Sequence, residues 1–167
     1  MLLIIVLETK NDNGSDYLYY KSILSRFYQE RGTGVKLQPV FMNSKTNYKS
    51  IGSKIAYYQN QYASENHVIY FCDYDKPELN FDQRMLNNDI IQFCNNNNYD
   101  LVWFNRTIED VLIGKIITDN KTKIALNFYK DDKIYNVDEN KLYSKDLPLS
   151  HKSNVLTILD VYLPKKR

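Results

Sequence analysis

Four short apolar segments, separated by stretches with helical periodicity, constrain the fold of this chain more than any other feature. They are residues Leu2–Leu7, Val35–Met42, Val68–Cys72 and Leu101–Phe104. Each has the length of a strand, and the unbroken apolar runs Leu2–Leu7 and Val68–Cys72 are typical of strands buried on both faces. Strands that alternate with amphipathic helices are typical of βαβ units. We therefore expect an α/β fold: a mainly parallel sheet of four strands, or slightly more, with helices on both faces.

The segments between the strands carry apolar residues every three or four positions, as amphipathic helices do. A first helix is expected between Ser15, which can act as its N-cap, and Gly32, which can end it. A third helix is expected to end in the run Asn95–Asn98. Thr107 and Asp110 approximate a capping box at the start of a fourth. The positions that mark the first three helices are Tyr20, Ile23, Leu24, Phe27, Ile51, Ile55, Tyr58, Tyr62, Leu86, Ile90 and Phe93.

The last third of the chain has a weaker pattern. Ile124–Lys130 is compatible with a helix or a strand, Lys130–Lys145 is charged and loop-like, and a short helix is expected around Val155. At 167 residues the chain is long enough for one domain with a substantial core. We expect residues 1–117 to form this core and residues 118–167 to form an extension packed on the same domain.

Net charge and cysteine content restrict the ligands and the cellular compartment expected for this chain. The net charge of +2 is too small to argue by itself for binding to nucleic acid or a membrane, so any phosphate-binding surface must be local. Cys72 and Cys94 lack metal-ligand spacing, which favours reduced thiols and a cytoplasmic protein. The apolar run Leu2–Leu7 is too short for a signal peptide or a membrane span, and no membrane partner is expected.

Acidic residues follow two of the predicted strands. Glu8 comes directly after the first strand, and Asp73 and Asp75 come directly after the third. Because parallel strands have their carboxyl ends at one edge of the sheet, these acids are expected to converge, although about 65 residues separate them. Asp16 and Glu109 begin helices that start at the same edge. The sequence thus predicts five carboxylates around one rim.

Like charges held together are unfavourable unless a cation joins them. Hard carboxylate oxygens suit Mg²⁺ or Mn²⁺, and an ion held there could act on a phosphodiester. The alternative is a solvated loop whose acids merely end a strand. Basic residues in the rim loops could bind phosphate, although each could equally be a solvated side chain. They are Lys10, Lys45, Lys76 and Arg106, of which Lys76 and Arg106 share loops with the acids.

The order of these acids resembles the Toprim domain of topoisomerases, primases and small nucleases. The segment Leu-Glu8, followed by Asp16 in an aromatic-rich helix, is similar to the family's first motif. Phe-Cys-Asp73-Tyr-Asp75 resembles its DxD motif, and Thr-Ile-Glu109-Asp resembles a late glutamate of overcoming-lysogenization-defect (OLD-like) and RloB-like members. The match covers roughly residues 2–117. It departs from the family at Thr9, where Toprim sequences usually carry glycine.

The resemblance implies roles for the matched residues. Glu8 would be a metal ligand or the general acid/base, Asp73 and Asp75 would hold a divalent ion, and Asp16 and Glu109 would complete a second metal site. It also implies a small nuclease that cuts DNA or RNA, with a separate partner such as an ATPase as an option. The short format is typical of phage-defence or mobile-element proteins.

Three other interpretations remain open. A Toprim-like module could bind nucleic acid or a partner without catalysis, its acids holding a structural ion. A phospho-accepting receiver domain shares the α/β plan and a proline four residues after Asp73, but it needs a pair of acids after its first strand. A haloacid-dehalogenase-type phosphatase carries its DxD on the first strand rather than the third.

Overall fold

The computed structural model describes residues 1–29, 32–75, 80–145 and 151–166. Four parallel strands form one sheet in the order β2-β1-β3-β4. They are β1 (Leu2–Leu7), β2 (Lys36–Phe41), β3 (Asn66–Asp73) and β4 (Asp100–Phe104). All four predicted strands are present in a single sheet, which confirms the expected α/β class.

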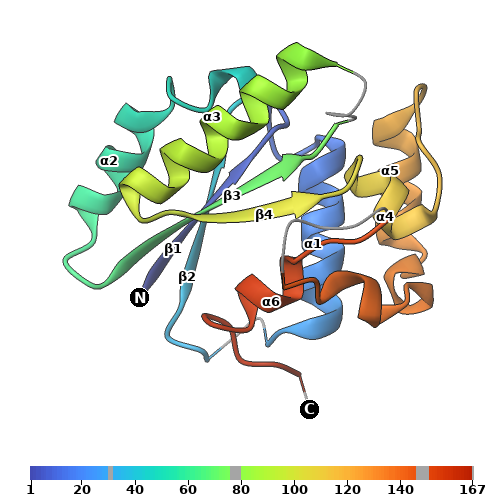
Figure 1. The fold of residues 1–167 in the computed structure, drawn as a ribbon. Helices are drawn as coiled ribbons and strands as arrows, with labels where there is room; N and C mark the ends of the chain where they lie inside the picture. Colours follow the sequence, from blue (N-terminus) through green and yellow to red (C-terminus); the bar gives the residue numbers. More distant parts are fainter. Residues whose placement is uncertain (30–31, 76–79, 146–150, 167) are drawn as a thin grey trace.

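Helices cover both faces of this sheet (Figure 1). One face is covered by α1 (Ser15–Phe27), α4 (Ile108–Ile113), α5 (Lys121–Lys130) and α6 (Val155–Leu159), with the short 3₁₀ turns η2 (Lys133–Asn136) and η3 (Glu139–Leu142). The other face is covered by α2 (Gly52–Gln61) and α3 (Phe81–Asn97), and the 3₁₀ turn η1 (Lys45–Asn47) precedes α2. The chain therefore has three layers, with the sheet in the middle.

The central strand β1 divides its side chains between two hydrophobic cores. Leu3, Ile5 and Leu7 pack on the α1 side, whereas alternate residues such as Ile4 pack on the α2 side. Side chains alternate between the faces of a strand, so a strand covered on both faces must be apolar throughout. All six residues of β1 are fully buried, which is the physical reason for the unbroken apolar run.

The strand order reverses between β1 and β3, and this places a crevice at their carboxyl ends. After β1 the chain continues into α1 on one face, and after β3 it continues toward α3 on the other face. Connections that leave two adjacent strands in opposite directions open the crevice in which α/β proteins bind ligands. The fold thus places the residues that follow β1 and β3 at this crevice.

Two helix boundaries differ from the sequence prediction. Gly14, not Ser15, is the N-cap of α1, and the Ser15 hydroxyl donates a hydrogen bond to the Asp16 carboxylate. The same helix ends at Phe27 rather than at Gly32, because Tyr28 adopts an extended conformation and forms a β-bridge with Lys165.

The other boundaries of interest lie in α3 and the C-terminal third. Helix α3 continues through the asparagine run to Asn97 and ends where Asn98 adopts a left-handed conformation with φ of 53°. The ambiguous segment around Ile124 is helical, as part of α5. Helices α5 and α6 share one hydrophobic cluster with α1.

Within the described ranges, no helix combines the length and apolar character that crossing a lipid bilayer requires.

Candidate metal centre at the carboxyl edge of the sheet

Glu8 and Asp73 meet across the crevice between β1 and β3. Glu8 directly follows β1, and Asp73 is the last residue of β3. The Asp73 backbone N–H donates a hydrogen bond to Glu8 Oε1 at 2.9 Å. The parallel register places Leu7 beside Phe71, so Glu8 lies one residue and Asp73 two residues beyond this pair at the same end of the sheet. The structure therefore brings together two predicted acids that lie far apart in the sequence.

The start of α4 is fixed against the same pair. The backbone N–H of Ile108 donates a hydrogen bond to Asp73 Oδ1 at 2.9 Å. Thr107 caps the helix as predicted, since its hydroxyl accepts a hydrogen bond from the Asp110 N–H. This arrangement places Glu109, the second residue of α4, beside the crevice.

Glu109 is an unusual buried acid. Its side chain is 1% exposed, and neither carboxylate oxygen has a hydrogen-bond partner among the described residues. Lys121 is its ion-pair partner, with Nζ 3.6 Å from Oε1. Burial is the main reason why the pKa values of Asp16 and Asp73 are raised, and the charge of Glu109 adds to both shifts. A buried carboxylate without hydrogen bonds costs free energy. Among the described residues, both oxygens of Glu109 lack the hydrogen-bond donors that would offset this cost.

Electrostatic coupling extends over the whole cluster. Burial is the main reason why the pKa of Glu8 is raised to about 8, and the charges of Asp16 and Asp75 raise it further. Burial also raises the pKa of Asp73 well above its usual range, helped by Glu8, Asp16, Glu109 and Asp75. The pKa of Asp16 is raised by burial and then by Glu109. Burial and the neighbouring charges, those of Asp75 and Glu109 included, thus disfavour the ionised forms of Glu8, Asp16 and Asp73.

Lys45 is a component of this centre whose role the sequence did not reveal. Its side chain is nearly buried, and its ammonium group lies 2.5 Å from Asp75 Oδ2 and 3.0 Å from the Asp73 carbonyl oxygen. A third hydrogen bond of 3.2 Å goes to Oδ1 of Asn87, a fully buried residue of α3. The sequence predicts Lys45 only as one of several phosphate ligands in the rim. Its partners are 28 to 42 residues away in the sequence, so no local pattern indicates them.

A small cavity of about 10 Å³ lies within the cluster. Glu8, Asp16 and Asp73 line it together with apolar residues of the strand ends. This volume is near the minimum that one water molecule occupies. It offers room for one small ligand atom or ion next to three carboxylates.

The donor chemistry fits a hard divalent cation, but the side chains are not arranged as a ligand set. In the described part of the chain, no group of three or more His, Cys, Asp or Glu side chains is placed to hold a metal ion. Glu8 and Asp73 accept hydrogen bonds from backbone N–H groups, and Asp75 is paired with Lys45. Carboxylates can bind Mg²⁺ or Mn²⁺ here only if some of them turn away from these partners.

The predicted phosphate ligands differ in their exposure. Lys10 is exposed in the loop after β1. Arg106 is partly buried between β4 and α4. Lys76 follows the DxD motif but lies outside the described residues.

The comparisons with known proteins add no relative. No protein-family model, curated protein or solved structure matches the chain.

Proposed function

We propose that the protein is a divalent-metal-dependent nuclease of Toprim type, which hydrolyses phosphodiester bonds with Mg²⁺ or Mn²⁺. One observation carries the proposal. The buried carboxylate of Glu109, which has no hydrogen-bond partner among the described residues, acts on Asp16 and Asp73 beside the strand ends where Asp73 and Glu8 meet. A surplus of desolvated negative charge at the crevice of an α/β sheet is what a divalent cation would neutralise.

The acids would coordinate two ions. Glu8, Asp73 and Asp75 would hold one ion, and Asp16 and Glu109 would complete a second site. A bound divalent ion supplies positive charge that stabilises a phosphodiester during attack by water. The backbone N–H groups of Asp73 and Ile108 hold Glu8 and Asp73 at the crevice, each through one carboxylate oxygen. Lys10, Arg106 and Lys76 are proposed to contact the phosphates of the substrate.

The Toprim resemblance extends this proposal to the biological setting. It suggests DNA or RNA as substrate, a cytoplasmic protein, a separate partner such as an ATPase, and a role in phage defence or a mobile element. These points depend on the resemblance alone.

A second candidate function is favoured by Lys45. Its ammonium group already neutralises Asp75 and contacts the Asp73 carbonyl, as an internal substitute for a metal ion. A Toprim-like module that binds nucleic acid or a partner without catalysis would need no more than this. The two candidates differ in whether a divalent ion supports cleavage.

A cleavage assay tests the proposal. Plasmid DNA and a structured RNA are incubated with the protein in Mg²⁺, Mn²⁺ or EDTA, with Asp73→Asn and Glu8→Gln as test variants. Asp89→Asn is a matched control, because Asp89 is an exposed acid of α3. We expect metal-dependent cleavage that is lost in both test variants and kept in the control. Cleavage that persists in EDTA, or that survives Asp73→Asn, would refute the metal-dependent mechanism.

A further inference from the structure

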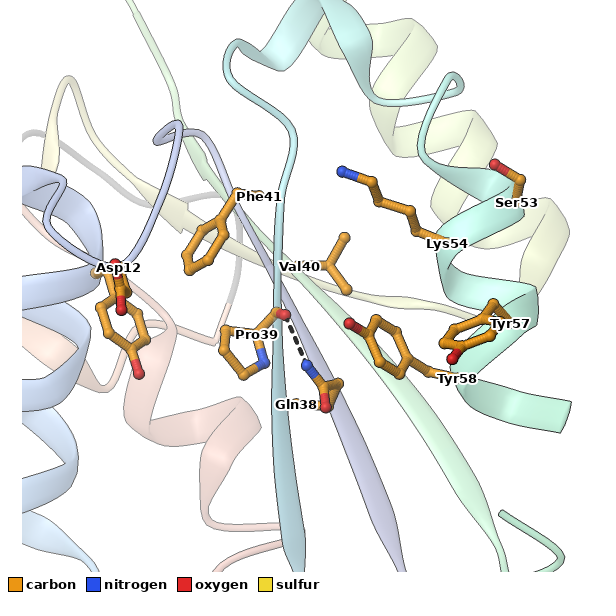
Figure 2. Close-up of a pocket in the computed structure, with 10 residues that line it drawn as sticks. Asp12, Gln38, Pro39, Val40, Phe41, Ser53, Lys54, Tyr57 and Tyr58 are labelled. Carbon is orange, nitrogen blue, oxygen red and sulfur yellow. Dashed lines mark hydrogen bonds between the residues drawn. The ribbon is translucent and has the colours of Figure 1, made fainter. Parts of the chain in front are cut away.

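A large groove runs along the open edge of the sheet, away from the acidic cluster. It has a volume of about 550 Å³ and follows the edge strand β2 between the start of α1 and helix α2 (Figure 2). Its lining residues include Tyr17, Gln38, Pro39, Phe41, Lys54, Tyr57 and Tyr58. The proposed catalytic centre does not use these residues.

Aromatic rings form both walls of the groove. Phe41 lies on one side of β2, and Tyr57 and Tyr58 lie on the other (Figure 2). The rings of Tyr57 and Tyr58 pack edge to face at 5.3 Å, and those of Tyr17 and Phe41 do so at 5.6 Å. Tyr57 is 58% exposed, which is high for a large aromatic side chain. Exposed, rigid rings of this kind are suited to stacking on flat ligands.

The edge strand itself is closed to a further strand. Pro39 removes a backbone donor from the middle of β2. The carbonyl oxygen of the same residue accepts a hydrogen bond of 3.1 Å from Gln38 Nε2 (Figure 2). A peptide that added to the sheet at this edge would lack both partners at the centre of the ladder. The groove therefore favours a ligand held by its rings and charges rather than by backbone pairing.

Lysines outnumber acids along this edge, although Asp12 also lines the groove. Residues 32–64, which include β2 and α2, contain four lysines and no aspartate or glutamate. Lys45 is committed to the acidic cluster, but Lys54 is exposed in the groove, and Lys36 and Lys49 lie over the rings of Tyr62 and Tyr48. In a chain whose charges nearly balance, this concentration complements a polyanion.

The groove along β2 extends to the carboxyl end of this strand, and the acidic cluster lies at the carboxyl ends of the neighbouring strands β1 and β3. Phe41, the last residue of β2, is in register with Leu7, which directly precedes Glu8. Beyond the strands, the Asn43 N–H donates a hydrogen bond to the Thr9 carbonyl oxygen at 3.1 Å. A ligand that lies along β2 would therefore reach the crevice at its carboxyl end.

We infer that this groove binds single-stranded nucleic acid, with bases stacked on its tyrosines and phosphates near Lys54. The inference deepens the proposed function and rests on it for the link between binding and cleavage. Base–aromatic stacking tolerates any sequence, so binding is expected to depend on strandedness and salt rather than on base identity.

Fluorescence anisotropy tests the inference with the full chain in EDTA, where binding is measured without metal-dependent cleavage. The probes are labelled oligothymidine, oligouridine and a DNA duplex. The test variants are Tyr57→Ala and Lys54→Glu. Their controls are Tyr135→Ala, at a tyrosine that is also 58% exposed, and Lys123→Glu, at an exposed lysine that is likewise the third residue of a ten-residue helix.

We expect the wild type to prefer single strands, and the oligothymidine and oligouridine arms show whether it prefers DNA or RNA. Tyr57→Ala should weaken binding about tenfold, and Lys54→Glu should weaken it and flatten its salt dependence, with both controls within about twofold of the wild type. Groove-dependent binding without any cleavage would support this inference and contradict the proposed nuclease. No oligonucleotide binding, binding that Tyr57→Ala leaves unchanged, or a protein dimer that depends on Tyr57 in place of binding would overturn the inference.

Discussion

At the scale of single residues, Lys45 partly neutralises the acidic cluster in the metal-free protein. Its ammonium group is desolvated and held by Asp75, the Asp73 carbonyl and Asn87. A buried cation with three oxygen partners offsets part of the repulsion among the surrounding carboxylates. A divalent cation at the same place would do this more effectively, because it carries twice the charge. Lysine and metal are therefore expected to compensate for each other.

Replacing Lys45 by methionine keeps the length of the side chain and removes its charge. We expect Lys45→Met to lower the free energy of unfolding in EDTA by about 2–3 kcal/mol, because Asp75 and Asn87 lose a charged partner. Mn²⁺ should restore part of this loss. Urea unfolding with and without Mn²⁺ measures both effects, and Lys54→Met, at an exposed lysine, should change stability by no more than about 0.5 kcal/mol. A Lys45→Met protein as stable as the wild type would show that the ion pair contributes nothing.

The raised pKa of Glu8 predicts how stability depends on pH. With a pKa of about 8 in the folded chain against 4.5 as its ordinary value, the protonated carboxyl is favoured by folding. This contribution is fully present below pH 4.5 and is lost as the pH rises through 8. For one proton, the slope is at most about 1.4 kcal/mol per pH unit.

Urea unfolding in EDTA across this range is the appropriate measurement. Glu8→Gln keeps the oxygen that accepts the Asp73 N–H bond and removes the titration, so its profile should be flatter than that of the wild type. Identical profiles for the two proteins would mean that Glu8 titrates normally in the folded state.

Removing the charge of Asp73 should stabilise the metal-free protein. Asparagine keeps an oxygen for the Ile108 N–H and removes one charge from the coupled cluster. We expect Asp73→Asn in EDTA to be more stable at pH 8 by about 1 kcal/mol, which corresponds to a rise of roughly 2–4 °C in Tm. Differential scanning calorimetry measures this, and the advantage should shrink at pH 5. A lower Tm than the wild type at pH 8 would contradict the repulsion on which the site is argued.

At the scale of elements, helix α4 holds the cluster in place through its first turn. The Thr107 hydroxyl accepts the Asp110 N–H, and the neighbouring Ile108 N–H is donated to Asp73. Thr107→Ala should cost about 1 kcal/mol of stability, whereas Thr107→Ser should cost much less because it keeps the hydroxyl. Urea unfolding of the three proteins checks this order. Equal losses in the alanine and serine variants would show that the methyl group of Thr107, not its cap, is what matters.

The elements also show what the sequence can and cannot predict. Strands β1 and β3 can be predicted because burial on both faces requires continuous apolar runs, whereas the edge strand β2 tolerates Lys36, Gln38 and Pro39 and has the weaker pattern. The end of α1 cannot be predicted in this way, because Tyr28 leaves the helix to form a β-bridge with Lys165, more than 130 positions away in the sequence. The convergence of Glu8 and Asp73 follows from strand direction alone. The contacts of Lys45 depend on the tertiary packing of η1 against β3 and α3, which no local pattern records.

At the scale of the whole molecule, the strand order unites the two proposed activities. Because β1 lies between β2 and β3, only this strand separates the groove along β2 from the acidic crevice between the ends of β1 and β3. One edge of the sheet is basic and aromatic, and the crevice beside it is acidic. A nucleic-acid strand held along β2 would present a phosphodiester to the carboxylates that follow β1 and β3.

The most direct test of this account is the binding of Mn²⁺ to the acidic cluster. Isothermal titration calorimetry compares the wild type with Asp73→Asn, and Asp89→Asn serves as the control for the loss of one exposed acid. We expect the wild type and the control to bind Mn²⁺ with the same affinity and stoichiometry, and Asp73→Asn to bind at least tenfold more weakly. If the wild type and Asp73→Asn bind Mn²⁺ equally, or if neither binds it, the cluster is not a metal site and the proposed nuclease mechanism is wrong.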